Sequence, residues 1–92
     1  MKYQVKYTNR FEKDLKQAIK RGKNLDKLFA IIEKLANDEQ LEPKNRLHTL
    51  VGEYEGCWEC HIEPDWLLVY EKFDDVLVLT MYRTGTHSDL FD

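Results

Sequence analysis

Cysteine, proline, glycine and long apolar runs are all scarce in this 92-residue chain, which has two cysteines, two prolines and four glycines. No apolar run approaches the roughly 18 residues that a membrane span requires. The first residues alternate between polar and apolar side chains and lack the apolar core of a secretory signal. We therefore expect one domain over residues 1–92 that works in the cytoplasm and has no membrane partner.

The two cysteines, Cys57 and Cys60, form a C-x-x-C pattern, which in other contexts marks a redox pair or half of a zinc site. The surrounding residues have the composition of a strand, however. Residues three apart in a strand point to opposite faces, which disfavours a shared metal ion or a disulfide. Both cysteines are therefore interpreted as small buried hydrophobic residues, and no cofactor is expected.

Charge is distributed unevenly along the chain. The formal net charge is −3, which by itself argues against a nucleic-acid partner. Residues 1–29 nevertheless carry nine Lys and Arg against three Asp and Glu, whereas residues 30–92 carry five against fourteen. A basic first third supplies the attraction to phosphates that RNA binding needs, although a solvated helix face would have the same composition.

Hydrophobic periodicity predicts a strand followed by a helix at the start of the chain. Residues 2–7 alternate in period two, as the residues of a half-buried strand do. Asn9 followed by Glu12 predicts a helix start, and Gly22 predicts the end of that helix.

A second helix is expected from Asn24 or Asp26 to Ala36. The link to the first helix is short, so the two helices should form an antiparallel pair. Residues 37–52 are polar and are expected to form a long loop, which in compact domains is usually functional or disordered.

Three strands are expected in the second half of the chain, over residues 53–62, 66–73 and 76–83. Pro64–Asp65 and Asp74–Asp75 supply the turns between them, and such short turns make the strands antiparallel. The order of elements predicts an α+β domain: an N-terminal strand, an antiparallel helix pair, and a three- to four-stranded antiparallel meander, with the helices on one face.

Five residues of the second half have side chains suited to phosphodiester chemistry: His48, His61, Asp65, Arg83 and His87. Histidine acts as acid or base near neutral pH, and arginine presents two donors to a phosphate. A zinc site made of the three histidines and Asp65 is a rival interpretation, but no fixed zinc-binding spacing such as H-E-x-x-H is present. Each of these residues also has a purely structural explanation.

Other residues are candidates for holding RNA. Trp66 and Phe91 lie near the candidate site and are able to stack on bases. Basic residues of the first helix fall off its apolar stripe, and we expect them to face solvent and phosphate: Lys13, Lys16, Lys20 and Arg21. The alternatives are that Trp66 is a core residue and that Arg83 pairs with an acid.

Three stretches of the chain resemble the YafQ branch of the RelE toxin superfamily. They are L-H-T-L-V-G-E-Y-E-G over residues 47–56, H-I-E-P-D-W-L-L-V-Y over 61–70 and R-T-G-T-H-S-D-L-F over 83–91. The expected order of elements also fits that family. The resemblance implies a RelE-like fold and a type II toxin that enters the ribosomal A site. It also implies metal-independent cleavage of mRNA there, leaving a 2′,3′-cyclic phosphate and a 5′-hydroxyl.

The same resemblance implies roles for the five candidate residues. His87 is expected to be the general acid, and Arg83 to stabilise the phosphate. Asp65, His61 or His48 would act as base or orient the 2′-hydroxyl, and the sequence leaves that choice open.

The family also implies partners, namely a cognate antitoxin protein, the 70S ribosome with its mRNA, and operator DNA reached only through the antitoxin. An acidic antitoxin tail that docks on the basic first helix is physically reasonable. The chain departs from the family in its net acidic charge and in Tyr54, which stands where a tryptophan is usual. A ParE-like gyrase inhibitor on the same fold is the alternative, but such proteins lack the clustered histidines.

Overall fold

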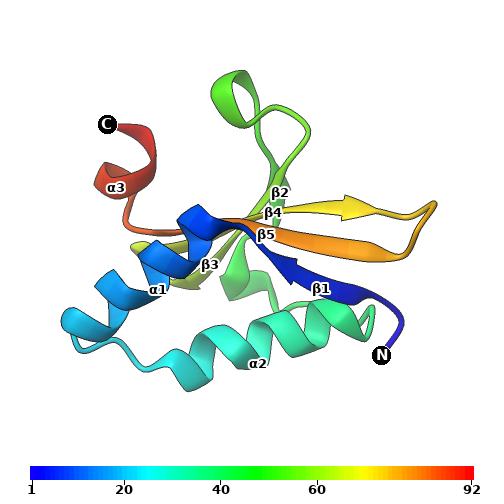
Figure 1. Ribbon diagram of the computed structural model, residues 1–92, viewed down its shortest axis with the longest axis horizontal. Helices are drawn as coiled ribbons and strands as arrows, with labels where there is room; N and C mark the ends of the chain where they lie inside the picture. The colour runs from blue at the N-terminus through cyan, green and yellow to red at the C-terminus, as the bar shows by residue number, and fades with distance from the viewer.

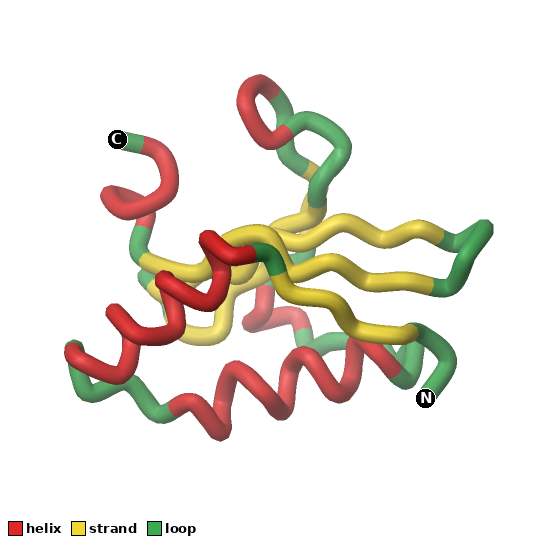
Figure 2. Tube along the Cα trace, viewed as in Figure 1, coloured by secondary structure: helices red, strands yellow, loops and turns green.

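A five-stranded sheet lies between two long helices and a smaller cap in the computed structural model, which describes residues 1–92 (Figures 1 and 2). In chain order the elements are β1 (Gln4–Tyr7), α1 (Asn9–Lys20), α2 (Leu25–Ala36), the 3-10 helix η1 (Pro43–Asn45), β2 (His48–Thr49), the 3-10 helix η2 (Gly52–Tyr54), β3 (Trp58–Glu63), β4 (Trp66–Phe73), β5 (Val78–Gly85) and α3 (His87–Phe91). The strand order is β1-β5-β4-β3-β2, with β1 parallel to β5 and the other pairs antiparallel. The predicted α+β architecture is confirmed. None of the helices combines the length and apolar composition needed to span a bilayer.

The N-terminal cap of α1 lies one residue before the position that the sequence suggested. Thr8 is the cap, and its hydroxyl accepts a hydrogen bond from the Phe11 amide at 3.0 Å. Asn9, expected to be the cap, is instead the first helical residue. The Thr8 hydroxyl also donates to the Tyr82 carbonyl of β5 at 2.9 Å, so the cap ties α1 to the sheet.

The link between α1 and α2 confirms the predicted helix boundaries. Gly22 has a φ of +75°, a left-handed conformation that glycine adopts without steric cost, and α1 ends beside it. Asn24 then caps α2 by accepting a hydrogen bond from the Asp26 amide at 3.0 Å. The two helices run in opposite directions beneath the sheet and diverge from this link (Figure 1).

The strands β3 and β5 and the C-terminal element differ most from the prediction. β3 begins at Trp58 rather than at residue 53, because Gly52 and Gly56 have φ angles of +77° and +92° and the intervening chain forms η2. β5 begins at Val78, two residues later than expected, and is followed by α3, which the sequence analysis did not predict. The predicted long loop contains η1 and β2.

Side chains of β4 are buried on both faces of the sheet, whereas the sequence analysis expected cover on one face only. Trp66, Leu68 and Tyr70 belong to the core beneath α1 and α2. Leu67 and Val69 belong to a second cluster, which is covered by α3 and by the segment before β3. Its other members are Leu90 and Cys57, and Leu50, Tyr54 and Tyr82 pack against it. The continuous apolar run of β4 is therefore explained by two covered faces.

The two cysteines lie in different clusters, as their spacing predicts. Cys60 belongs to the core under the helices, and Cys57 belongs to the cluster under α3. Both thiols are free and buried. Burial raises the pKa of the Cys60 thiol to about 12, so this thiol stays protonated near neutral pH and is a packing residue.

Candidate active site

The three histidines form a row that joins β2, β3 and α3. His48 lies on β2, His61 on β3, and His87 is the first residue of α3. The ring centroids of His48 and His61 are 6.2 Å apart, and those of His61 and His87 are 6.0 Å apart. The ring of Phe91 continues the row, with its centroid 6.1 Å from that of His87. The fold thus brings together residues that are far apart in the sequence.

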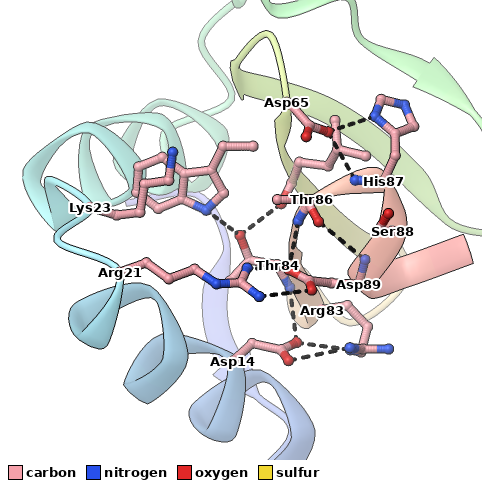
Figure 3. A network of polar contacts seen from close by, with 12 residues as sticks. Asp14, Arg21, Lys23, Asp65, Arg83, Thr84, Thr86, His87, Ser88 and Asp89 are labelled. Carbon is pink, nitrogen blue, oxygen red and sulfur yellow. Dashed lines mark hydrogen bonds and ion pairs between the residues drawn. The ribbon is translucent and has the colours of Figure 1, made fainter. Parts of the chain in front are cut away.

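Asp65 holds both the backbone and the ring of His87 (Figure 3). Its Oδ1 accepts a hydrogen bond from the His87 amide at 2.9 Å and lies 2.9 Å from His87 Nδ1. These hydrogen bonds lower the pKa of Asp65 below its ordinary value, so this carboxylate is charged near neutral pH and only accepts. His87 Nδ1 therefore carries hydrogen, and Nε2 is the atom able to give or take a proton. The His87 side chain is 57% exposed, so a substrate can reach it.

A buried carboxylate, Glu59, lies behind the other two histidines, and the sequence analysis missed it. Glu59 is 3% exposed, and its Oε1 lies 3.1 Å from His48 Nε2 and 3.6 Å from His61 Nε2. Its Oε2 is buried without a hydrogen-bond partner. A buried carboxylate with an unused acceptor is costly, and such groups are typical of functional sites.

One signal in the sequence was able to identify Glu59. It precedes His61 by two positions in a strand, and residues at that spacing point to the same face. An acidic residue on the covered face of a strand needs a partner, and His61 was the partner available.

Hydrogen-bond partners fix the positions of the protons in this cluster. His48 Nδ1 faces the Arg46 carbonyl at 2.7 Å, and His61 Nδ1 faces the Pro64 carbonyl at 3.1 Å. A carbonyl only accepts, so both Nδ1 atoms carry hydrogen and both Nε2 atoms are left facing Glu59. A proton that enters this cluster therefore meets three groups that face one another.

Arg83 pairs with an acid and reaches the histidine row only through two aromatic rings. Its Nε lies 2.8 Å from Asp14 Oδ2, and its Nη2 lies 3.3 Å from Asp14 Oδ1. Its Nη1 donates to the Tyr54 hydroxyl at 3.2 Å, and the Tyr54 ring packs edge-on against Phe91. The structural alternative considered for Arg83 is thus present, and its contact with a phosphate stays a prediction.

Trp66 is a core residue, and its predicted role in stacking on RNA bases is wrong. The residue is 2% exposed, and its indole Nε1 donates to Thr84 Oγ1 at 3.0 Å. A ring buried in this way stabilises the core beneath the helices and has no face open to a base. Phe91, by contrast, is 44% exposed and stays a candidate for stacking.

The basic residues of the first helix divide into two groups. Lys13, Lys16 and Lys20 are exposed and take part in no ion pair, so contact with phosphate stays a prediction for them. Arg21 instead forms a two-point ion pair with Asp89, at 2.5 and 3.0 Å. The structure therefore gives Arg21 a protein partner in place of the predicted phosphate.

The rival interpretation of His48, His61, His87 and Asp65 as a zinc site is not supported by their arrangement. No group of three or more His, Cys, Asp or Glu side chains is placed to hold a metal ion. The carboxylates instead divide the row into two parts, because Asp65 contacts His87 and a different acid contacts the other two histidines.

Comparison with known sequences gives one toxin family along nearly the whole chain. Residues 3–92 match the family described as "Bacterial toxin of type II toxin-antitoxin system, YafQ". The mRNA interferase toxin YafQ of Escherichia coli strain K12 is 38% identical over 88 residues, which cover 95% of this chain and 94% of that protein.

Solved structures are similar over the same extent. The crystal structure of YafQ from E. coli strain BL21(DE3) has a TM-score of 0.91 and 35% identity, and the match covers 98% of this chain and 99% of that chain. A chain of the E. coli DinJ-YafQ toxin-antitoxin complex has a TM-score of 0.88 and 35% identity over the full length of both. The likeness thus includes every element that carries the candidate site.

Proposed function

Because this chain belongs to the YafQ family of toxins from type II toxin–antitoxin systems, we propose that it is an endoribonuclease that cleaves mRNA. The observation that carries the proposal is the row of three histidines with two carboxylates beside it, in a chain that matches this family over residues 3–92. The name of the E. coli relative, an mRNA interferase, favours this activity over the gyrase inhibition considered as the alternative.

The proposed reaction is the attack of an RNA 2′-hydroxyl on the adjacent phosphate. The 2′-oxygen bonds to phosphorus as it loses its proton, and the bond to the 5′-oxygen breaks as that oxygen gains one. The products are a 2′,3′-cyclic phosphate and a 5′-hydroxyl. Such a reaction needs one base and one acid, each of which typically contributes about 10²- to 10⁴-fold to the rate. We propose that no metal takes part, because side chains of this chain supply both groups.

His87 is the proposed general acid. Asp65 accepts from Nδ1 and from the backbone amide, so the ring is held with Nε2 free to carry a second proton. The exposed ring is able to approach the 5′-oxygen of a bound RNA and deliver that proton.

The cluster of His48, Glu59 and His61 is the proposed base. Of the three bases left open by the sequence, Asp65 is the least suitable, because its lowered pKa makes it a weak base and His87 occupies its Oδ1. The Nε2 atoms of His48 and His61 both face the Glu59 carboxylate, so these three groups would share a proton taken from the 2′-hydroxyl. The base is therefore assigned to the cluster as a unit.

Exposed residues around the row are the proposed contacts with RNA. Phe91 adjoins His87 and is suited to stacking on a base. The unpaired lysines of α1 supply attraction to phosphates. Arg83 has N–H groups beyond those that face Asp14, and we propose that one of them stabilises the reacting phosphate.

We propose that the ribosome presents the mRNA and that a cognate antitoxin holds the toxin inactive in the cytoplasm. The chain has a net charge of −3, so free RNA is attracted only by its basic first third, and a ribosome-bound message would be the better substrate. The E. coli YafQ complex with DinJ supports an antitoxin partner, through which the pair would reach operator DNA.

The proposal is tested by in vitro translation of a defined message with the purified protein, with cut ends mapped by primer extension. Cuts at A-site codons that persist in EDTA-treated, magnesium-repleted reactions and disappear with H87A are expected. An intact message would overturn the proposal, and loss of gyrase supercoiling in a parallel assay would support the alternative.

A further inference from the structure

Helix α1 contacts the segment that carries His87 at two points, which Figure 3 shows side by side. One contact is made by Asp14 in the middle of the helix, and the other by Arg21 directly after its last turn. Neither residue belongs to the histidine row. Both act on the junction of β5 and α3, where the chain turns toward His87.

At the end of β5, Asp14 accepts a backbone hydrogen bond that a neighbouring strand would otherwise accept. Parallel pairing with β1 ends at Met81, so β5 continues beyond it without a neighbouring strand on that side. There the Oδ2 of Asp14 accepts a hydrogen bond from the Thr84 amide at 3.1 Å, in addition to that from Arg83 Nε. A nearly buried carboxylate with three donors around it fixes both the backbone and the side chain of this strand end.

Arg21 fixes the first turn of α3 through Asp89. Asp89 forms a capping box with Thr86, since its side chain accepts from the Thr86 amide at 2.9 Å and its amide donates to Thr86 Oγ1 at 3.1 Å. The guanidinium of Arg21 holds the same carboxylate at two points and keeps the pKa of Asp89 well below its ordinary range. His87 is the residue directly after the cap, so its position follows that of Asp89.

The close approach of Asp89 to the strand end depends on Gly85. A Cβ added at Gly85 would lie 2.8 Å from Asp89 Oδ2 and 2.9 Å from Asp89 Cβ. Asp89 therefore packs directly on the backbone between Thr84 and Thr86. No side chain separates the α3 cap from the end of β5.

The turn that carries Asp65, the acid partner of His87, is also held by ion pairs from the helix layer. Glu63, two residues before Asp65, lies 3.1 Å from Lys23 Nζ and 3.0 Å from Lys27 Nζ. These lysines come from the link between α1 and α2 and from α2 itself. Both halves of the Asp65–His87 pair are thus tied to the helix layer by ion pairs.

From these contacts we propose that Asp14 and Arg21 are positioning residues for His87. They hold the β5–α3 junction so that the His87 ring meets Asp65 with its Nε2 directed at the substrate. The inference rests on the proposed function for its effect on RNA cleavage. It also changes the assignment of Arg21, from a phosphate contact to a residue that acts through Asp89.

The test compares R21M with K6M in the purified toxin. Both substitutions remove one positive charge from the basic first third, but Lys6 is exposed on β1 and takes part in no ion pair. D89N removes the charge of Asp89, the partner of Arg21, and keeps a side-chain oxygen that accepts the hydrogen bond of the α3 cap. The double variant R21M/D89N completes a double-mutant cycle. R21K keeps the charge without the two-point contact and replaces R21M if that variant fails to fold.

Two readouts separate positioning from RNA binding. In single-turnover cleavage on programmed ribosomes, R21M and D89N should lower the rate at saturating toxin by about 100-fold, the scale expected for a displacement of about 1 Å. The half-saturating toxin concentration should change less than about 2-fold, and the double variant should be no slower than either single variant. In NMR titrations of the free toxin, the pKa of Asp65 should rise toward its ordinary value in D89N and stay low in K6M. The charge of Asp89 itself raises the pKa of Asp65, so a rise in D89N reports displacement of His87 and not the loss of that charge.

An unchanged cleavage rate with a raised half-saturating concentration in R21M would make Arg21 an RNA contact and overturn the inference. An unchanged or lowered pKa of Asp65 in D89N would overturn it as well. If the wild-type toxin cuts no mRNA, the proposed function fails, while the Asp65 titration still decides whether the contact between Arg21 and Asp89 positions the Asp65–His87 pair.

Discussion

The two parts of the histidine row are built in opposite ways. His87 and Asp65 are both exposed, and they lie at chain turns that are held by ion pairs from α1, α2 and the link between these helices. Glu59 and His61 are buried within the sheet, and His48 covers them from the two-residue strand β2. The position of the exposed pair therefore depends on ion pairs with residues distant in the sequence, whereas the buried cluster is positioned by the core around it.

This difference matches the chemistry assigned to each part. An acid that must approach a leaving group benefits from an accessible ring and one fixed carboxylate. A base that must accept and store a proton benefits from low solvent access, because hydrogen bonds among its groups are then stronger. The first two of the following variants each change one part of the row and leave the other in place.

The largest expected effect is on the exposed part. H87A removes the acid, and the cleavage rate should fall by about 10²- to 10⁴-fold without loss of stability, because the ring is exposed. The measurement is single-turnover cleavage on programmed ribosomes, together with thermal unfolding. S88A, which removes only a surface hydroxyl paired with Asp92, is the matched control and should cleave at the wild-type rate. Full activity of H87A would contradict the assignment of the acid.

The next effect concerns the buried part. E59Q replaces the carboxylate by an amide that donates to an imidazole Nε2 but stores no proton, so the cleavage rate should fall by about 100-fold. The free energy of unfolding should change by no more than about 1 kcal/mol, since Oε2 makes no hydrogen bond that would be lost. E55Q, at an exposed residue without an ion pair, is the control. If E59Q cleaves at the wild-type rate, the cluster of His48, Glu59 and His61 has only a structural role and is not the base.

A smaller effect separates the two aromatic residues near the row. W66F removes the hydrogen bond to Thr84 and should lower the free energy of unfolding by about 1 kcal/mol with no change in cleavage. F91A should weaken cleavage instead, because its ring is exposed beside His87. Urea unfolding and cleavage assays on both variants check this, and a cleavage defect in W66F alone would restore its predicted role with RNA.

The smallest effect is on stability in acid. The Arg21 guanidinium holds the pKa of Asp89 well below its ordinary value of 3.8, so this pair stabilises the fold above about pH 4, and the stabilisation is lost as the pH falls through the lowered pKa. D89N should be about 1 kcal/mol less stable than the wild type near neutral pH, and this difference should shrink in strong acid. Urea unfolding at several pH values measures it. A constant difference would mean that the pair contributes little.

All three histidines of the row and Asp65 were candidates from the sequence, and Glu59 was not. Proline and aspartate mark the turn at Asp65, and the stretch after Arg83 contains turn residues, so two turns with reactive side chains were visible. The strand β4, the cap at Asn24 and the opposite placement of the cysteines followed from periodicity and spacing.

The remaining features depend on contacts between distant residues. The helix α3 has only five residues; its capping box between Thr86 and Asp89 is a local pattern that could have been read from the sequence, whereas the contact with Arg21 that holds the cap spans 68 positions. Burial of Trp66 depends on cover from both helices, and the pairing of Asp14 with Arg83 spans most of the chain. Such contacts are set by tertiary packing and leave no local signal.

The division of the row into an acid part and a base part is tested most directly with a message that carries a sulfur in place of the scissile 5′-oxygen. A thiolate leaves without a proton, so the acid becomes unnecessary while the base is still required. H87A is expected to cleave this message at nearly the wild-type rate, and E59Q is expected to stay about 100-fold slower. If H87A is equally slow on the oxygen and sulfur messages, His87 is not the general acid.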